Sequence, residues 1–420
     1  MSKRPEMLLP DNWPCYYSKA KGITVWDLDG NSYQDVGYHG IGACVLGYGD
    51  DDVDNAVIDA IKCGSTSILN SPQEVELAEL LVDLHPWADM ARFSRSGGEA
   101  MSIAVRIARS ATNRDVVLFC GYHGWHDWYL AANLAQGNDN LSDHLLPGLK
   151  AKGVPSHLSG SAVPFHYNDI EEFHRRLSEI GDRLAAVVME PVRSSDPLPN
   201  YLETIADLTK KAGAVLIFDE ITSGFRLCPG GAHLHFGVDP DISVFAKSLS
   251  NGYPMGAVIG RREVMEAAQD TFVSSTAWTE STGPAASIAA VNKYIENQVQ
   301  EHQKKAGEEV CEIWTKNANA TSELAIDISG IKPLSHLSLK THESGNPSEQ
   351  KTFLTQEMLK RGFLATTSFY ATSCHDAESL AQYDQAISEV FGHMSDHLKA
   401  GTLREALDGP VVHTGFYRLS

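Results

Sequence analysis

Between residues 90 and 260 the chain alternates short apolar runs with longer amphipathic segments, and this alternation restricts the fold more than any other feature. A short, continuously apolar run fits a strand that is buried on both faces, and the segments between the runs are long enough to form crossover helices. The pattern predicts an α/β fold with a mostly parallel sheet covered by helices on both faces. The expected strands are residues 90–94, 115–120, 184–189, 214–218, 242–245 and 257–260.

The chain on either side of this region predicts a second, smaller α+β domain. Asp29-Gly30-Asn31 lies between alternating apolar residues and predicts a hairpin over residues 23–33, whereas residues 1–20 contain several prolines and fit an irregular arm. We expect an N-terminal arm and hairpin (1–44), a large domain (45–290) and a C-terminal region (291–420) that joins the N-terminal part in the small domain.

The remaining elements are expected from helical spacing of apolar residues and from turn-forming composition. After Pro284 a long connecting helix is expected over residues 285–314. The segment 137–165, rich in Gly, Pro, Ser and Asn, is expected to be a long loop that borders the site. Further helices are expected at residues 52–63, 74–84, 99–110, 201–212, 353–361 and 377–394.

Charge and cysteine content restrict the class of partner and the compartment. The chain has 34 basic and 54 acidic residues, a formal net charge of −20, which argues against nucleic acid or an anionic membrane as the main partner. The seven cysteines are scattered and odd in number, with no Cys-x-x-Cys pair, which favours a reducing cytoplasm over a disulfide framework. No apolar run is long enough to span a membrane.

Lys247 is the first candidate for chemistry. It follows the apolar run 241–245 and precedes a stretch of small and turn-forming residues. A lysine at the end of a buried strand is costly unless it is neutralised or reacts, and a Schiff base with an aldehyde neutralises it. Pyridoxal 5′-phosphate (PLP) is held in this way. Most lysines are solvated surface residues, so Lys247 alone does not identify a cofactor.

Two groups earlier in the chain fit other parts of such a ligand. Ser96, Gly97 and Gly98 stand between an expected strand and an expected helix, where backbone N–H groups and the helix dipole favour a phosphate. Tyr122 follows another strand, where an aromatic ring can stack on a flat ligand. Taken alone, the first group can be explained as a capped strand-to-helix turn. Taken alone, Tyr122 can be explained as part of a packed aromatic loop.

Asp219 stands at the end of the apolar run 214–218. A carboxylate there can keep a pyridine nitrogen protonated, so that the ring withdraws electrons from a substrate. In extended geometry Ile221 points to the same side and can pack on the ring. A strand-end Asp that caps the next turn is the simpler explanation of Asp219 alone. PLP is indicated more strongly by four groups together than by any one of them: the turn at residues 96–98 (the phosphate turn), Tyr122, Asp219 and Lys247.

These groups lie in segments that resemble the class III, ornithine-type aminotransferases, which are PLP-dependent enzymes of fold type I. The resemblance runs from about Val25 to Phe391 and is nearest to the glutamate-1-semialdehyde aminomutase branch. It implies a large domain with a seven-stranded-type sheet and a small domain built from both termini. The matching segments are Ser96-Gly97-Gly98-Glu99-Ala100, Gly121-Tyr122-His123-Gly124, Glu190-Pro191-Val192, residues 218–226 and residues 246–257.

The resemblance also implies further site residues and an assembly. His123 and Glu190 are expected to contact the cofactor. A homodimer with active sites shared at its interface is expected, in which Thr276 binds the cofactor phosphate of the partner subunit. Gly98 stands where the family usually has a threonine, so backbone contacts to the phosphate must suffice.

Three further departures from the family concern the substrate. The segment from Ala277 to Pro284, which contains Trp278, is longer than in the family. Ile41 aligns with a tryptophan of the aminomutases, and residues 367–375 lack the glutamate that aminomutases carry there. The last two differences favour an aminotransferase over an aminomutase.

The sequence therefore predicts an aminotransferase that moves an amino group from an amino-acid donor to a keto or aldehyde acceptor. Ping-pong chemistry through Lys247 is expected, with catalytic roles for Asp219 and Tyr122 and a place in a biosynthetic pathway. An intramolecular aminomutase of the glutamate-1-semialdehyde type is the alternative within the family. The donor, the acceptor and the role of Arg226 stay open.

Alternatives from other classes also stay open. A nucleotide-binding α/β protein could use the turn 96–100 for phosphate, although the chain has no Gly-x-Gly-x-x-Gly after its first strand and no Walker-type motif. A metal-dependent hydrolase could use His123, His126, His233 and His235. No ligand set with a recognisable metal-site spacing accompanies these histidines, so no metal is expected.

Overall fold

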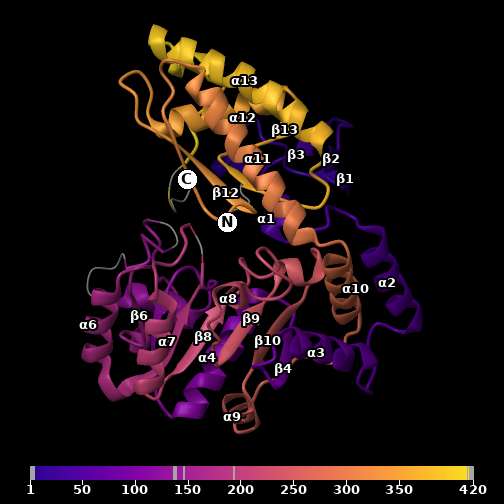
Figure 1. The fold of residues 1–420 in the computed structure, drawn as a ribbon, viewed down its shortest axis with the longest axis vertical. Helices are drawn as coiled ribbons and strands as arrows, with labels where there is room; N and C mark the ends of the chain where they lie inside the picture. The colour runs from indigo at the N-terminus through magenta and orange to yellow at the C-terminus, as the bar shows by residue number, and fades with distance from the viewer. Residues whose placement is uncertain (1–4, 136–139, 145–146, 193, 414, 416–420) are drawn as a thin grey trace. The chain divides into compact units, whose positions relative to one another are not determined.

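The computed structural model describes residues 5–135, 140–144, 147–192, 194–413 and 415. They form two compact units (Figure 1). Among the described residues, the large unit is Asp52–Ile295 with Gly415, and the small unit is built from residues 5–51 and 296–413. The expected domain boundaries, after residues 44 and 290, lie several residues earlier and stay a prediction.

The large unit contains a seven-stranded sheet in the order β4-β10-β9-β8-β7-β5-β6. Strand β10 runs antiparallel to both of its neighbours, β4 and β9, whereas the other adjacent pairs of this sheet are parallel. The expected mostly parallel α/β sheet is therefore confirmed. The strands are β4 (Met90–Ser94), β5 (Val116–Cys120), β6 (Ala162–Pro164), β7 (Leu184–Met189), β8 (Val215–Asp219), β9 (Ile242–Phe245) and β10 (Gly256–Gly260).

Alternate residues of the central strands enter two different cores. In β5, Val117 and Phe119 pack in the core that contains α4, whereas Val116 and Leu118 pack in the core that contains α6 and α7. Both faces are buried, which is why these strands are continuously apolar. The helices of this unit are α2 (Asp51–Cys63), α3 (Pro72–Leu84), α4 (Gly97–Thr112), α5 (Asp127–Leu130), α6 (Ile170–Ile180), α7 (Tyr201–Lys211), α8 (Ala232–Phe236), α9 (Arg262–Met265) and α10 (Thr282–Glu296).

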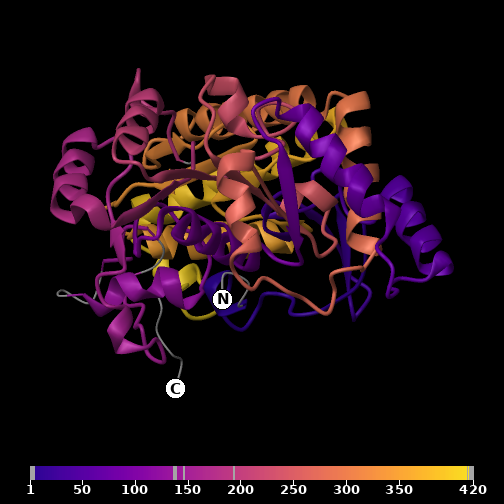
Figure 2. The same ribbon diagram turned by 90° about the horizontal axis from the view of Figure 1, so that it is seen from below.

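The small unit has two sheets, β1-β2-β3-β13 and β11-β12-β14. Helices α11 and α13 lie side by side, as do α12 and α13 (Figures 1 and 2). The expected hairpin is confirmed as the antiparallel pair β2–β3. The elements are β1 (Tyr17–Lys21), β2 (Thr24–Asp27), β3 (Ser32–Asp35), α1 (His39–Gly42), α11 (Val299–Asn319), β11 (Ile326–Ser329), β12 (Leu334–Leu339), α12 (Pro347–Lys360), β13 (Phe363–Leu364), β14 (Ser368–Tyr370) and α13 (Ala377–Ala400).

Several expected elements were wrong in extent. The single helix over residues 285–314 is two helices, α10 and α11, because Gln298 adopts a left-handed φ of 49° between them. The segment 137–165, expected to be a long loop, contains the edge strand β6. Its Pro164 has no N–H to donate, which an edge strand tolerates because it has a neighbouring strand on one side only. The arm 1–20 contains most of β1, which pairs with β2 although it is almost entirely exposed. Helix α12 begins at Pro347, after the capping box of Asn346 and Glu349, not at residue 353.

A buried polar cluster supports the ends of β8 and β9. Glu220, the residue after β8, accepts hydrogen bonds at 2.9 Å from both the backbone N–H and Nδ1 of His233. His233 Nε2 in turn accepts the Trp87 indole N–H at 2.9 Å. Burial alone would raise the pKa of Glu220, but the hydrogen bonds from His233 and Ser223 hold this pKa below its ordinary value. The cluster therefore keeps an anion inside the large unit.

His85 is a neutral member of the same cluster. Its ring stacks on His233 with centroids 5.5 Å apart, and its Nε2 accepts the Gly231 N–H at 3.0 Å. Burial lowers the pKa of His85 to about 4. The folded chain therefore binds its proton more weakly than the unfolded chain does.

We expect the large unit to lose stability as pH falls from about 6.5 toward 4. Between pH 7 and 5 the part due to His85 is about 2 kcal/mol, because only the unfolded chain takes up the proton in that range. Urea unfolding of the wild type and of His85→Gln at both pH values measures it. An equal loss in both proteins would contradict the assignment.

We expect Gly307→Ala to destabilise the small unit by about 1–3 kcal/mol. A Cβ at Gly307, inside α11, would collide with the carbonyl oxygen of Lys332. Gly392→Ala in α13 is the matched control, because no atom lies within 4 Å of a Cβ there. The control is expected to stabilise by roughly 0.5–1 kcal/mol. Thermal unfolding measures both, and a Gly307→Ala protein as stable as the control would contradict the expectation.

Candidate active site

Five of the sequence-predicted residues follow the ends of neighbouring strands. Strands β5, β7, β8 and β9 are mutually parallel, so their carboxyl ends meet at one edge of the large sheet (Figure 1). Ligands bind at this edge in open α/β sheets. Tyr122 and His123 follow β5, Glu190 follows β7, Asp219 ends β8 and Lys247 follows β9.

Asp219 and His123 form a buried pair. Asp219 Oδ2 lies 2.8 Å from His123 Nδ1, and Asp219 Oδ1 accepts the Ile221 N–H at 3.0 Å. The second ring nitrogen, His123 Nε2, lies 3.0 Å from the Cys120 carbonyl oxygen, which can only accept. His123 therefore faces an oxygen at each ring nitrogen. These two contacts hold the imidazole against the Asp219 carboxylate at a place away from water.

Tyr122 and Glu190 stand beside this pair. The Tyr122 N–H lies 3.5 Å from Glu190 Oε2, and a Cβ at Gly121 would lie 2.6 Å from the same oxygen. Gly121 also has a φ of 111°, so only glycine fits there. Burial and the negative charge of Asp219 raise the pKa of the Tyr122 phenol. Its ring remains 37% exposed, which leaves a face open to a ligand.

The turn at the start of α4 is close to the Asp219 loop. Ser96 caps the helix, with its hydroxyl 3.4 Å from the Glu99 N–H. A Cβ at Gly97 would lie 2.8 Å from Ile221 Cδ1, so this glycine lets the phosphate turn and Ile221 meet. Within the described residues no acceptor is assigned to the N–H groups of Gly97 and Gly98. Such first-turn N–H groups can bind an anion.

His126 occupies the space that a side chain at position 98 would need. A Cβ at Gly98 would lie 3.2 Å from His126 Nε2, and His126 Nδ1 lies 2.6 Å from the hydroxyl oxygen of Ser102. Gly124 approaches from the same side, since a Cβ there would lie 3.2 Å from Gly98 Cα. A side chain at position 98 would therefore press on the imidazole of His126, which would have to shift.

Lys247 has a strained backbone and a fixed amine. Its φ is 51°, which an L-residue other than glycine rarely adopts. Its Nζ donates to Thr222 Oγ1 at 2.7 Å. Strain of this kind is kept only where the surrounding structure holds it, and it concentrates at functional sites.

Thr276 stands apart from the other predicted residues. It is exposed, and no hydrogen bond joins it to them in the described parts of the chain. Its segment is hydrogen-bonded to the connection between α2 and α3: the Ser281 N–H donates to the Ser65 carbonyl at 2.9 Å, and the Thr279 and Thr66 hydroxyl oxygens are 3.0 Å apart.

Arg95, which the sequence reasoning missed, joins the Thr276 segment to the phosphate turn. Its guanidinium donates to the carbonyl oxygens of Ala277 (2.7 Å) and Glu280 (3.1 Å), and its Nε lies 3.2 Å from the Glu280 carboxylate. Arg92 lies over the ring of Trp278, 5.6 Å from its centroid. Arg92 of β4 and Arg95 of the following turn thus hold the segment that contains Trp278.

Thr222 and Arg226 belong to the turn after β8. Thr222 was missed as a site residue, because its contact with Lys247 joins the ends of two different strands and no spacing along the chain indicates it. Arg226 is 1% exposed, and its Nε donates to the Thr222 carbonyl at 3.4 Å. Arg226 therefore supports the turn that contains Thr222.

Three of the four histidines considered for a metal site have other partners. His123 pairs with Asp219, His126 with Ser102 and His233 with Glu220. In the described portion of the chain no group of three or more His, Cys, Asp or Glu side chains is arranged to hold a metal ion. None of the described helices combines the length and apolar character needed to cross a bilayer.

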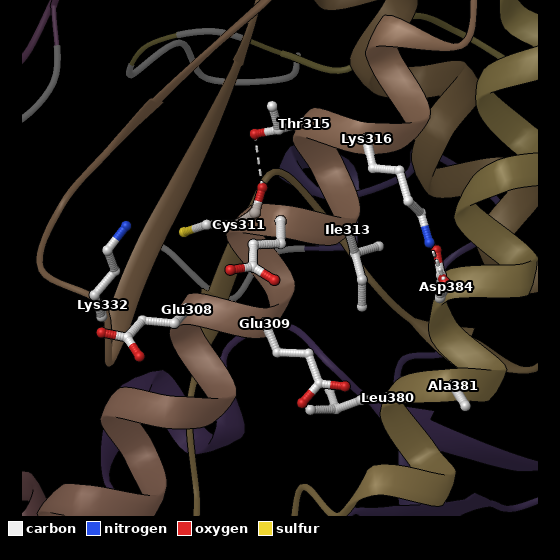
Figure 3. Close-up of a pocket in the computed structure, with 11 residues that line it drawn as sticks. Glu308, Glu309, Cys311, Ile313, Thr315, Lys316, Lys332, Leu380, Ala381 and Asp384 are labelled. Atoms are coloured by element: carbon white, nitrogen blue, oxygen red, sulfur yellow. Dashed lines mark hydrogen bonds and ion pairs between the residues drawn. The ribbon is translucent and has the colours of Figure 1, made fainter.

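A separate groove lies in the small unit between α11 and α13 (Figure 3). The Lys316–Asp384 ion pair, 2.6 Å long, spans it, and Glu308, Glu309 and Glu312 line it. It contains none of the residues predicted for the cofactor and is not part of the candidate active site.

Known proteins show the same sequence pattern and fold. The family model "Aminotransferase class-III" matches residues 9–396. The 3-aminobutyryl-CoA aminotransferase of Cloacimonas acidaminovorans is 30% identical, over 94% of this chain and 93% of its own length. A glutamate-1-semialdehyde 2,1-aminomutase of Sulfurihydrogenibium azorense is 36% identical, over 67% of this chain and 65% of its own.

Among solved structures, the PLP internal aldimine form of the Sphingopyxis sp. MTA144 FumI protein has the same fold, with a TM-score of 0.84 at 22% identity. The match covers 94% of this chain and 92% of that one. The resemblance expected from the motifs is confirmed, and the chain belongs to the class-III aminotransferase family.

Proposed function

We propose that this chain is a PLP-dependent aminotransferase that moves an amino group from an amino-acid donor to a keto or aldehyde acceptor in a biosynthetic pathway. Family membership supports the reaction class. The observation that carries the cofactor assignment is the position of Lys247 and Asp219 at the ends of the adjacent strands β9 and β8. All seven cysteines are free thiols, which supports a cytoplasmic location.

The site residues fit the parts of PLP one by one. The N–H groups of Gly97 and Gly98 and the Ser96 hydroxyl suit its phosphate. The open face of Tyr122 and the side chain of Ile221 suit the two faces of its ring. Asp219 suits the pyridine nitrogen, and the contact of its Oδ2 with His123 holds the carboxylate in place. His123 and Glu190, which are also expected beside the cofactor, contact Asp219 and Tyr122.

Lys247 has two roles in this proposal. Its amine holds the cofactor covalently between turnovers and is released when an amino donor binds. Bound PLP supplies a conjugated ring that can take up the electron pair of a broken C–H bond. The free amine of Lys247 then takes the proton from the substrate carbon and returns it at a second carbon, as a general base and acid. Donor and acceptor use the same site in turn, so ping-pong kinetics are expected.

An aminomutase is the second candidate. The 36% identity with the Sulfurihydrogenibium azorense aminomutase supports it. An aminomutase moves the amino group within one molecule and needs no separate acceptor. Ile41 and the absence of glutamate in residues 367–375 favour the aminotransferase. Turnover of glutamate-1-semialdehyde without an added acceptor would favour the aminomutase.

A homodimer is part of the proposal. Five large apolar side chains of α2, α3 and the connection between them are exposed, and Ile68 is 98% exposed. The connection is hydrogen-bonded to the segment that contains Thr276. A second copy covering this patch would bury the apolar surface and bring Thr276 to a subunit boundary. The exposed residues are Ile58, Ile61, Ile68, Leu69 and Val75.

We expect the purified protein with PLP to show a visible absorbance band that an amino donor bleaches. Lys247→Ala should lose the band and lower turnover roughly 10²- to 10⁴-fold, because the covalent link and the proton carrier are both removed. Lys211→Ala, an exposed lysine at the end of α7, is the control and should keep both. Absence of a band in the wild type at saturating PLP would overturn the proposal.

We expect Ile68→Asp to weaken the dimer roughly tenfold or more, since each interface would gain an unpaired charge in place of an apolar contact. Leu198→Asp, which changes an exposed leucine outside the patch, is the control. Sedimentation over a range of protein concentrations measures the dissociation constant. Equal dissociation constants for the two variants would contradict the placement of the interface.

A further inference from the structure

We propose that Thr222 is a positioning residue for Lys247, whose amine it holds whenever the lysine is not bonded to the cofactor. This inference rests on the proposed function and adds a residue to it. The contact is direct, since Lys247 Nζ donates to Thr222 Oγ1 at 2.7 Å. The hydroxyl stands three residues after Asp219, so one turn carries both the carboxylate and the acceptor for the amine.

The turn that carries Thr222 is held from several directions. Asp219 Oδ1 fixes the Ile221 N–H at 3.0 Å, and the Gly224 N–H donates to the Glu220 carbonyl at 2.8 Å. Arg226 Nε donates to the carbonyl of Thr222 itself. A Cβ at Gly224 would lie 2.7 Å from the Glu220 carbonyl oxygen, so the turn closes tightly. The Thr222 hydroxyl is therefore presented by a backbone with little freedom to move.

The turn that carries Lys247 is joined to the first turn at two points. The Ser248 hydroxyl donates to the Gly224 carbonyl at 2.8 Å, and Lys247 Nζ donates to Thr222. The two turns follow adjacent parallel strands, β8 and β9. The Ser248 bond joins backbone and side chain away from the amine, whereas the Thr222 bond acts on the reactive nitrogen. The two bonds can therefore be tested against each other.

Holding the amine has a chemical consequence. A free lysine side chain samples many rotamers, and ordering it costs free energy that a fixed acceptor offsets in advance. An amine that donates one N–H to Thr222 keeps its lone pair for the substrate. When Lys247 takes the proton, the substrate C–H bond breaks, an N–H bond forms, and the electron pair passes to the conjugated cofactor. A held amine is also ready to recapture the cofactor.

The test compares Thr222→Val, which keeps the shape but loses the hydroxyl, with Thr222→Ser, which keeps the hydroxyl. Ser248→Ala is the matched control, because it removes the other link between the same two turns and leaves the contact of the Lys247 amine with Thr222 in place. The first measurement is the rate at which cofactor-free protein captures PLP, followed by the absorbance band. The second is the rate at which the donor that bleaches the wild-type band converts the bound cofactor, over a range of donor concentrations.

We expect Thr222→Val to slow both rates about tenfold, the effect of about one hydrogen bond, with the half-saturating donor concentration unchanged. Thr222→Ser should restore both rates, and Ser248→Ala should lower the melting temperature without slowing either rate. Wild-type rates in Thr222→Val, equal slowing in Ser248→Ala, or failure of Thr222→Ser to restore the rates would each overturn the role of Thr222. A wild type that captures no PLP would instead overturn the proposed function.

Discussion

A buried carboxylate needs hydrogen-bond partners, and the contact between Asp219 and His123 organises the candidate site. His123 reaches Asp219 from the end of β5, although β7 lies between β5 and β8 in the sheet. The side chain therefore crosses the end of β7, where Glu190 stands. Gly121 lets the Glu190 carboxylate approach, because any Cβ there would collide with it. This one contact thus fixes the relative positions of three strand ends and of the loop that presents Tyr122.

The lysine depends on a second constraint, the strain of its backbone. A left-handed φ costs a residue other than glycine roughly 1–2 kcal/mol, and the chain would relax if nothing opposed it. The hydrogen bond from the Lys247 amine to Thr222 in the neighbouring turn opposes it. That turn is itself fixed by Asp219 and by Glu220, whose charge is held by His233. The electrostatic compensation and the strained lysine are therefore parts of one arrangement.

The sequence predicted the parts of this arrangement that are local. Strands such as β5 could be predicted because both of their faces are buried and their sequences are continuously apolar. Strand β6 was not predicted because it is short and contains a proline. The left-handed Gln298 between α10 and α11 carries no composition signal. Asp219, Lys247 and the phosphate turn could be recognised from their places at strand ends and helix starts. The partners of these residues, His123 for Asp219 and Thr222 for Lys247, depend on which strands are neighbours, and no spacing along the chain states that.

The departures from the family pattern are compensated where they occur. His126 fills the space beside Gly98, where the resemblance leads us to expect a threonine, and the segment after Thr276 is bound by Arg95 and Arg92. Neither compensation touches Asp219 or Lys247. The residues at the rim of the site can therefore change while Asp219 and Lys247 at the strand ends keep their roles. Differences in substrate between this protein and its relatives are therefore to be sought in the segment around Trp278, because its contacts with Arg92 and Arg95 leave Asp219 and Lys247 untouched.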